Sequence, residues 1–103
     1  MIRLAVLGAG AWGTAIACVL AGRLPVTLWV RDPAQAQAME ATRSNERYLA
    51  GVPLPESLAL TSQLERALEG AALALIATPV AGLRSVLEAI GARLAFVLSL
   101  IHI

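Results

Sequence analysis

The chain has 103 residues, enough for one hydrophobic core, and its formal net charge is +1. Its charged residues are scattered singly and form no basic stripe that could hold a nucleic-acid backbone, so we expect no nucleic-acid partner. The single cysteine, Cys18, excludes a disulfide within the chain and a cysteine-ligated metal site. We therefore expect no bound metal and a reducing, cytoplasmic location.

A hydrophobic share of 58% and a mean hydropathy of +0.74 are high for a soluble domain. Residues 4–22 form an uncharged run that superficially resembles a membrane span or a signal peptide. Four glycines interrupt this run where a membrane helix would carry large apolar side chains (Gly8, Gly10, Gly13 and Gly22). We therefore expect no membrane span and attribute the hydrophobicity to strands that are buried on both faces.

The first part of the chain alternates between strand and helix patterns. Ile2–Leu7 is an apolar run without polar alternation, which predicts a buried parallel strand. Ala11–Gly22 contains small and medium apolar residues suited to a tightly packed helix. Val26–Val30 is rich in β-branched and aromatic residues and predicts a second strand. Asp32 then looks like the N-cap of a helix over Pro33–Thr42.

Residues 43–57 break this periodicity with one glycine and two prolines, and we interpret them as a functional loop. Leu58–Thr61 predicts a short strand, and Ser62 with Glu65 has the spacing of a capping box that opens a helix over Gln63–Glu69. The remaining predicted elements are a strand over Ala72–Ala77, a helix over residues 80–90 and a strand over residues 94–98. This order predicts an α/β fold with an open parallel sheet of about five strands and helices on both faces.

The glycine motif between the first predicted strand and the first predicted helix is typical of dinucleotide-binding domains of the Rossmann type. Gly8 permits the tight turn, Gly10 lets the backbone approach a pyrophosphate, and Gly13 allows the helix to pack closely on the strand. The free N–H groups at the start of the helix would face the anion. The alternative is an ordinary glycine-rich turn with no ligand.

Arg31 stands at the end of the second predicted strand, where NAD-binding folds usually carry an acidic residue for the ribose hydroxyls. A guanidinium suits a 2′-phosphate, so we favour NADP over NAD as the cofactor. Asp32, one residue later, could serve the ribose instead if the strand ends later. Trp12 either covers the cofactor or packs against other side chains of the domain. Tyr48 either contacts the nicotinamide side of the cofactor or anchors its own loop. We expect Cys18 to lie in the hydrophobic core.

Further candidates lie at the end of the chain. Thr78 and Pro79 follow the strand predicted over Ala72–Ala77, at the edge of the sheet where ligands bind, or else simply begin a helix. His102 has no carboxylate or cysteine near it, and we assign it no role.

Five segments together resemble the N-terminal part of bacterial NAD(P)-dependent glycerol-3-phosphate dehydrogenase. They are G-A-G-A-W-G-T-A at 8–15, L-W-V-R-D-P at 28–33, R-S-N-E-R-Y-L at 43–49, G-V-P-L-P at 51–55 and A-T-P-V-x-x-L-R at 77–84. The resemblance implies reversible reduction of dihydroxyacetone phosphate to sn-glycerol 3-phosphate, for phospholipid synthesis in the cytoplasm. It implies cofactor contacts at Gly8, Gly10, Ala11, Trp12, Gly13, Arg31 and Tyr48. Ala11 stands where the family often has serine, and Ala50 replaces a common proline.

The end of the chain departs from this family. The family continues into a Lys-Gly pair, whose lysine would align near Ser99, but this chain reads LSLIHI there and contains no lysine. We therefore expect residues 1–98 to be a partial NAD(P)-binding domain, incomplete at its C-terminus, and residues 99–103 to be an atypical tail. We also expect no catalytic residue, no substrate domain and no turnover by the chain alone. The alternatives are the cofactor domain of another NAD(P)-dependent reductase and a stand-alone nucleotide-binding domain, and the full-length parent would be a candidate homodimer.

Overall fold

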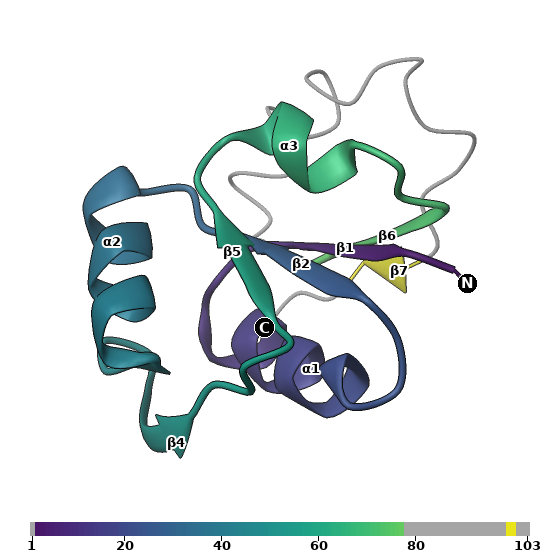
Figure 1. Cartoon of the computed structure of the whole chain (residues 1–103). Coiled ribbons are helices and arrows are strands. Elements are labelled where there is room, and N and C mark those ends of the chain that lie inside the picture. Colours follow the sequence, from purple (N-terminus) through teal and green to yellow (C-terminus); the bar gives the residue numbers. More distant parts are fainter. Residues whose placement is uncertain (1, 78–98, 101–103) are drawn as a thin grey trace.

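The computed structural model describes residues 2–77 and 99–100, which form helices on both sides of a central sheet (Figure 1). In chain order the elements are β1 (Leu4–Leu7), α1 (Ala11–Ala21), β2 (Val26–Trp29), α2 (Pro33–Thr42), β3 (Ser44–Asn45), β4 (Leu49–Pro53), β5 (Ala59–Thr61), α3 (Leu64–Leu68), β6 (Leu73–Ile76) and β7 (Ser99–Leu100). The helix predicted over residues 80–90, the strand predicted over 94–98, Thr78, Pro79 and His102 lie outside the described residues.

The main sheet has five strands in the order β5-β2-β1-β6-β7, and every adjacent pair is parallel. β1 lies at the centre, where Leu4 pairs with Val26 of β2 on one side and with Leu73 of β6 on the other. The chain thus moves outward from β1 to β5 and returns to β6 on the opposite side. This order reverses between β1 and β6, which is where such folds bind ligands. The predicted doubly wound α/β fold of about five strands is confirmed.

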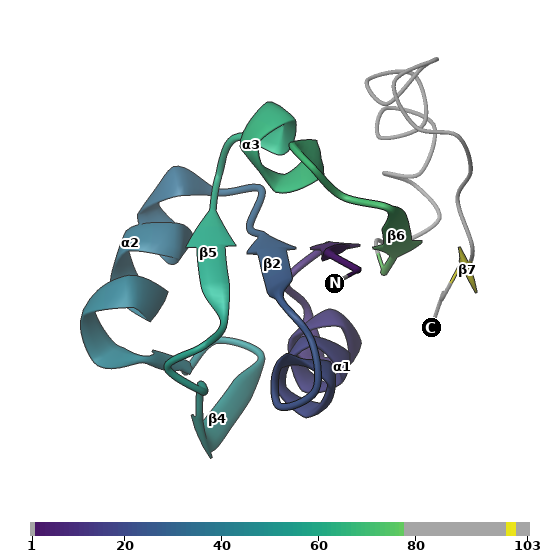
Figure 2. The same ribbon diagram turned by 45° about the vertical axis from the view of Figure 1, so that its right-hand side comes forward.

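The strands of the sheet are apolar because both of their faces are covered. Leu4 and Val6 of β1 belong to a buried cluster that includes Ala17 of α1 and Met39 of α2. Ala5 and Leu7 point to the other face, since side chains alternate along a strand, and they pack with Ala67 and Leu68 of α3. Figure 2 shows α1 and α3 on opposite faces, with α2 beside β5.

Cys18 of α1 packs against the first of these clusters, as the sequence predicts. Burial raises the pKa of its thiol, and the more distant positive charge of Arg43 opposes this rise. The thiol therefore stays protonated at neutral pH, as expected of a packing residue. Within the described residues, no helix is both long and apolar enough to cross a membrane.

The starts of two predicted elements are wrong by small amounts. β1 begins at Leu4 because the partner strand β2 begins opposite it, at Val26, and Ile2 is exposed. α3 begins at Leu64 with Gln63 as its N-cap, so Ser62 is not the cap and Glu65 lies one position too early in the helix for a capping box. The N–H of Gln63 instead donates to the hydroxyl of Thr61 at 3.1 Å.

The segment predicted to be an irregular loop contains a small antiparallel ribbon, so that prediction is wrong in part. Ser44 of β3 pairs with Pro53 of β4, and Asn45 pairs with Leu49, with a register shift between the two pairs. Gly51 adopts a φ of 81°, which glycine accommodates without strain. Strand pairs this short leave no periodic pattern of apolar residues in the sequence, so the ribbon was not predicted. Pro53 is tolerated in β4 because β4 is an edge strand.

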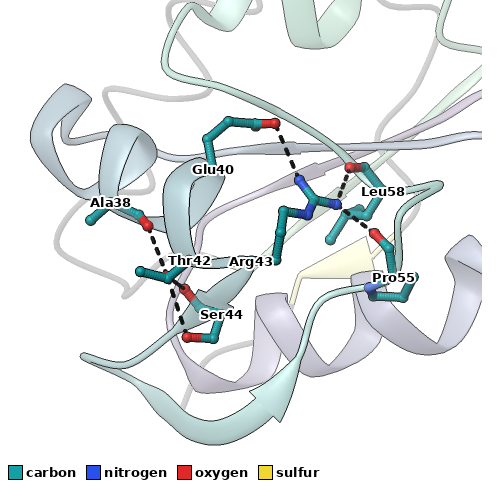
Figure 3. A network of polar contacts seen from close by, with 7 residues as sticks. All are labelled: Ala38, Glu40, Thr42, Arg43, Ser44, Pro55 and Leu58. Atoms are coloured by element: carbon teal, nitrogen blue, oxygen red, sulfur yellow. Dashed lines mark hydrogen bonds and ion pairs between the residues drawn. The ribbon is translucent and has the colours of Figure 1, made fainter.

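Arg43 fixes the connection between α2 and this ribbon (Figure 3). It is the C-cap of α2, with a left-handed φ of 53°, and its backbone N–H donates to the carbonyl of Met39 at 2.7 Å. Its guanidinium donates to the carbonyl of Leu58 at 3.0 Å and to that of Pro55. An ion pair with Glu40, at 3.4 Å, completes the group. One arginine therefore holds the end of a helix and the return of the chain to β5.

We expect Arg43→Ala to lower the free energy of unfolding by about 2 kcal/mol, because two carbonyls lose a charged donor. The backbone strain at this position stays similar, because a positive φ is sterically unfavourable for alanine as well as for arginine. Urea denaturation measures the change. Glu40→Gln is the matched control: it removes only the solvent-exposed ion pair and should cost no more than about 0.5 kcal/mol. Equal losses in the two variants would contradict a carbonyl-anchoring role for Arg43.

The last described strand, β7, lies within the residues that the sequence analysis assigns to an atypical tail. It pairs in parallel with β6, Ser99 with Leu75 and Leu100 with Ile76. The domain boundary at residue 98 stays a prediction.

Candidate dinucleotide-binding site

The candidate site lies at the carboxyl end of β1, where the glycine turn leads into α1. Gly8 adopts a φ of 125°, a conformation that side chains rarely allow, and its N–H donates to the carbonyl of Trp29 at 3.2 Å. Ala77, which follows β6, donates its N–H to the carbonyl of Leu7 at 2.8 Å. The turn is therefore held between the ends of β2 and β6, beside the point where the strand order reverses.

Gly13 is required by the close approach of α1 to the turn. A Cβ at this position would lie 1.8 Å from the carbonyl oxygen of Gly8 and 3.2 Å from the Cβ of Ala77. Both values are shorter than ordinary van der Waals contact. The packing role that the sequence predicts for Gly13 has this physical basis.

Gly10, unlike Gly13, lies beside open space. A Cβ there would meet, beyond its chain neighbours, no atom of the described residues within 4 Å. Its φ of −74° and ψ of −170° are open to other residues, so neither internal packing nor backbone strain requires a glycine. The space beside Gly10 fits a group from outside the protein that approaches the backbone closely, which is the role of the second glycine in a dinucleotide-binding turn.

The start of α1 is suited to an anion. Within the described part of the chain, no side chain caps this helix, and no acidic residue lies in its first turn. The first N–H groups of a helix have no partner within it, and the aligned peptide dipoles make this end positive. Ala11 and Trp12 begin the helix and are exposed. Their backbone N–H groups could therefore bind a pyrophosphate.

The end of β2 carries the residues expected to distinguish the two cofactors. Arg31 is exposed and has no hydrogen bond or ion pair with any residue in the ranges 2–77 and 99–100. Asp32 caps α2, since its carboxylate accepts the N–H of Ala34 at 3.0 Å. The other oxygen of this carboxylate lies 4.0 Å from Arg47. Arg31 is thus free to bind, whereas Asp32 is engaged in its own helix.

Trp12 and Tyr48 are two of the few large apolar side chains that are exposed, at 53% and 45% respectively. Tyr48 lies in the connection between β3 and β4, where the guanidinium of Arg47 stands 5.2 Å from the centre of its ring. Neither ring is buried in a core, and the cofactor contacts expected of Trp12 and Tyr48 stay predictions. Aromatic rings exposed beside a candidate site are suited to cover a ligand.

Two residues that the sequence analysis did not single out contribute to the site. Arg47 adds a second cation near the end of β2. Asn45 is buried beneath the glycine turn and donates to the carbonyl of Ala9 at 2.8 Å. Both belong to a short polar stretch in which no periodicity marks one side chain as buried. Only the ribbon geometry brings them to the turn.

The parallel sheet, the reversal of strand order beside a glycine turn, and the uncapped helix define a dinucleotide-binding domain of the Rossmann type. Residues 3–103 match the family model described as the NAD-dependent glycerol-3-phosphate dehydrogenase N-terminus. The chain belongs to this family.

Individual relatives agree with this assignment. The chain is 54% identical over 84 residues to the glycerol-3-phosphate dehydrogenase [NAD(P)+] of Aromatoleum aromaticum, covering 82% of this chain and 26% of that protein. It is 55% identical to the enzyme of the same name from Thermus thermophilus, covering 81% of this chain and 26% of that protein. The chain thus spans about a quarter of the length of these relatives.

Solved structures give the same result for the fold. The crystal structure of glycerol-3-phosphate dehydrogenase from Coxiella burnetii superimposes with a TM-score of 0.82 at 38% identity, covering 86% of this chain and 28% of that one. Glycerol-3-phosphate dehydrogenase from Saccharomyces cerevisiae superimposes with a TM-score of 0.84, covering 95% of this chain and 33% of that one. At 21% identity, the yeast protein supports the fold alone.

Proposed function

We propose that this chain is the cofactor-binding portion of an oxidoreductase that interconverts dihydroxyacetone phosphate and sn-glycerol 3-phosphate, and that it prefers NADP(H) to NAD(H). The open space beside Gly10, at the uncapped start of α1, is the observation that carries the binding part of the proposal. The substrate rests on the family and its relatives. A cytoplasmic location, a role in glycerophospholipid synthesis and a homodimeric full-length parent belong to the same proposal.

In this proposal the glycine turn holds the pyrophosphate. Gly8 and Gly13 keep the turn tight against α1, while the N–H groups of Gly10, Ala11 and Trp12 donate to phosphate oxygens. Trp12 and Tyr48 flank the bound molecule with their exposed rings. The bound nicotinamide would supply the hydride, and the residues named here bind and orient it.

The preference for NADP(H) is supported by the different states of Arg31 and Asp32. A ribose 2′-hydroxyl needs a free acceptor, but the Asp32 carboxylate already accepts a backbone N–H and lies near Arg47. A 2′-phosphate needs cations, and Arg31 is exposed, with Arg47 as a second guanidinium in the same region. Charge-assisted, forked hydrogen bonds from arginine to phosphate are among the strongest available at a protein surface.

Titration calorimetry of the chain with NADPH and with NADH tests the cofactor site and its preference for NADP(H). We expect NADPH to bind about 10-fold more tightly, because one charge-assisted contact contributes about 1.5 kcal/mol or more. The difference should shrink as salt is added, since the charges are exposed. Dihydroxyacetone phosphate added to the NADPH-loaded chain should cause no NADPH oxidation, because the 103 residues contain no lysine, the residue that the family resemblance implies beside the substrate. Tighter binding of NADH would contradict the preference, and binding of neither would contradict the site.

A further inference from the structure

Asn45 and Thr14 are the two buried polar side chains among the described residues, at 1% and 0% exposed. They contact each other, since the Asn45 Nδ2 group donates to the hydroxyl of Thr14 at 2.8 Å. Thr14 is the fourth residue of α1, and Asn45 lies in β3. A buried polar group is costly unless it is hydrogen-bonded, so this pair requires a specific arrangement of α1 and the ribbon.

The side-chain amide of Asn45 is fully engaged. Its Nδ2 group also donates to the carbonyl of Ala9, at 2.8 Å, and its Oδ1 atom accepts from the Gln35 Nε2 group at 3.3 Å. Gln35 itself reaches the carbonyl of Ala9, at 3.4 Å. Because a carbonyl can only accept, the nitrogen of the Asn45 amide must be the atom that faces Ala9. Asparagine therefore cannot be exchanged here for an ionised aspartate without losing both donated hydrogen bonds.

The contact with Ala9 sets the direction of the next N–H group. The peptide between Ala9 and Gly10 is trans, because the described backbone contains no cis peptide bond. In a trans peptide the C=O and N–H groups point to opposite sides of the chain. With the Ala9 carbonyl turned inward to Asn45, the Gly10 N–H turns outward. Gly10 is also the residue whose Cβ would meet open space.

The backbone of Asn45 connects to a second part of the site. The N–H of Tyr48 donates to the carbonyl of Asn45 at 3.2 Å, which closes the turn that carries Arg47 and Tyr48. Asn45 is therefore joined to the glycine turn through its side chain and to the exposed cation and aromatic ring through its main chain.

We propose that Asn45 is a positioning residue of the dinucleotide site. It orients the Ala9–Gly10 peptide so that the N–H groups at the start of α1 face the pyrophosphate, and it links this turn to the Arg47–Tyr48 segment. The proposal rests on the proposed function, because it assumes that the glycine turn holds a pyrophosphate. It assigns to Asn45 no contact with the cofactor.

The test compares two ligands on the 103-residue chain: NADPH, which contains the pyrophosphate, and adenosine 2′-phosphate, which lacks it. Asn45→Ala should weaken NADPH binding about 10-fold or more, since the donors that meet the pyrophosphate lose their orientation. Binding of adenosine 2′-phosphate should change less than about 3-fold, because the end of β2 is untouched and the main-chain bond to Tyr48 remains. A general loss of structure would weaken both ligands equally, and that result would overturn the proposal.

Thr14→Val is the matched control. It removes the hydrogen bond between Thr14 and Asn45 but leaves the one to Ala9, so NADPH affinity should stay within about 3-fold of wild type despite some loss of stability. If Asn45→Ala does not fold, Gln35→Ala tests the same connection from a half-buried position. We expect it to weaken NADPH binding about 5-fold, more than the control Thr14→Val does, and to leave adenosine 2′-phosphate binding unchanged.

Unchanged NADPH affinity in either Asn45→Ala or Gln35→Ala would overturn the positioning role. Failure of the wild-type chain to bind NADPH would instead overturn the proposed function, so the two failures are distinguishable.

Discussion

Replacing Gly13 with alanine should lower the free energy of unfolding by about 3 kcal/mol or more, the largest stability effect that we expect from a single methyl group in this chain. The new Cβ would lie 1.8 Å from the carbonyl oxygen and 3.0 Å from the carbonyl carbon of Gly8. Both are backbone atoms, so no side-chain rotation relieves the clash. Either α1 must move away from β1 or the turn must open. Urea denaturation followed by circular dichroism measures the loss.

Gly10→Ala is the matched control, because it adds the same methyl group to the same turn. The position has a φ that alanine adopts freely, and the added Cβ meets no described neighbour within 4 Å. Loss of the glycine N-cap and the reduced freedom of the unfolded chain act in opposite directions, so stability should change by less than about 1 kcal/mol.

NADPH affinity shows whether the space beside Gly10 is used by the cofactor, while stability shows whether Gly13 is needed for packing. We expect Gly10→Ala to weaken NADPH binding about 10-fold or more while the chain stays folded, because its Cβ enters the space assigned to the pyrophosphate. Wild-type affinity in Gly10→Ala would contradict this use of the space. Wild-type stability in Gly13→Ala would contradict the close contact between the turn and α1.

The second large effect is expected at Arg31. Arg31→Ala should weaken NADPH binding by about 10- to 100-fold and NADH binding by less than about 3-fold, because only NADPH carries the 2′-phosphate. Arg31 is exposed and has no hydrogen bond or ion pair with another described residue, so its removal should leave the fold intact. Calorimetry with both cofactors at low salt measures the change in selectivity.

Two control variants make the Arg31 experiment specific. Arg23→Ala removes another exposed arginine, which precedes β2 and so lies at the opposite end of that strand from Arg31, and it should leave the affinity for both cofactors unchanged. Asp32→Asn keeps an N-cap side chain but removes the carboxylate charge. If Asp32 held the ribose, this variant would weaken NADH binding. If Arg31→Ala weakened the binding of NADPH and NADH to the same degree, Arg31 would not be the residue that recognises the 2′-phosphate.

The elements that short-range patterns describe were predicted well. The apolar strands β1, β2 and β6, the helices α1 and α2 and the glycine turn all follow from residue types within a few positions of one another. Asp32 followed by Pro33 marked the start of α2 correctly, since N-cap chemistry is local. The start of α3 was misplaced by one residue, because neighbouring polar residues can each serve as a cap.

The segment between α2 and β5 was not predictable in the same way. Its residues are held by partners far along the chain: Asn45 bonds to Ala9 and Thr14, which are 36 and 31 residues away, and Arg43 bonds to Leu58, 15 residues away. No local propensity marks a polar side chain as buried when its partners come from another element. Here the packing of the ribbon under the turn decided the conformation.

The sequence by itself therefore determined the class of the fold, the position of the glycine turn and the presence of a cation after β2, because glycine geometry, hydrophobic period and charge are properties of neighbouring residues. The tertiary structure supplied the distances behind the glycine roles: a Cβ at Gly13 would overlap the carbonyl of Gly8, whereas a Cβ at Gly10 would meet no described neighbour within 4 Å. It also decided that Asp32 caps α2 while Arg31 has no hydrogen bond or ion pair within the described residues, and that Asn45 donates to the carbonyl of Ala9 in the turn. Each of these depends on distances between elements, which arise only when the helices and the ribbon pack against the sheet.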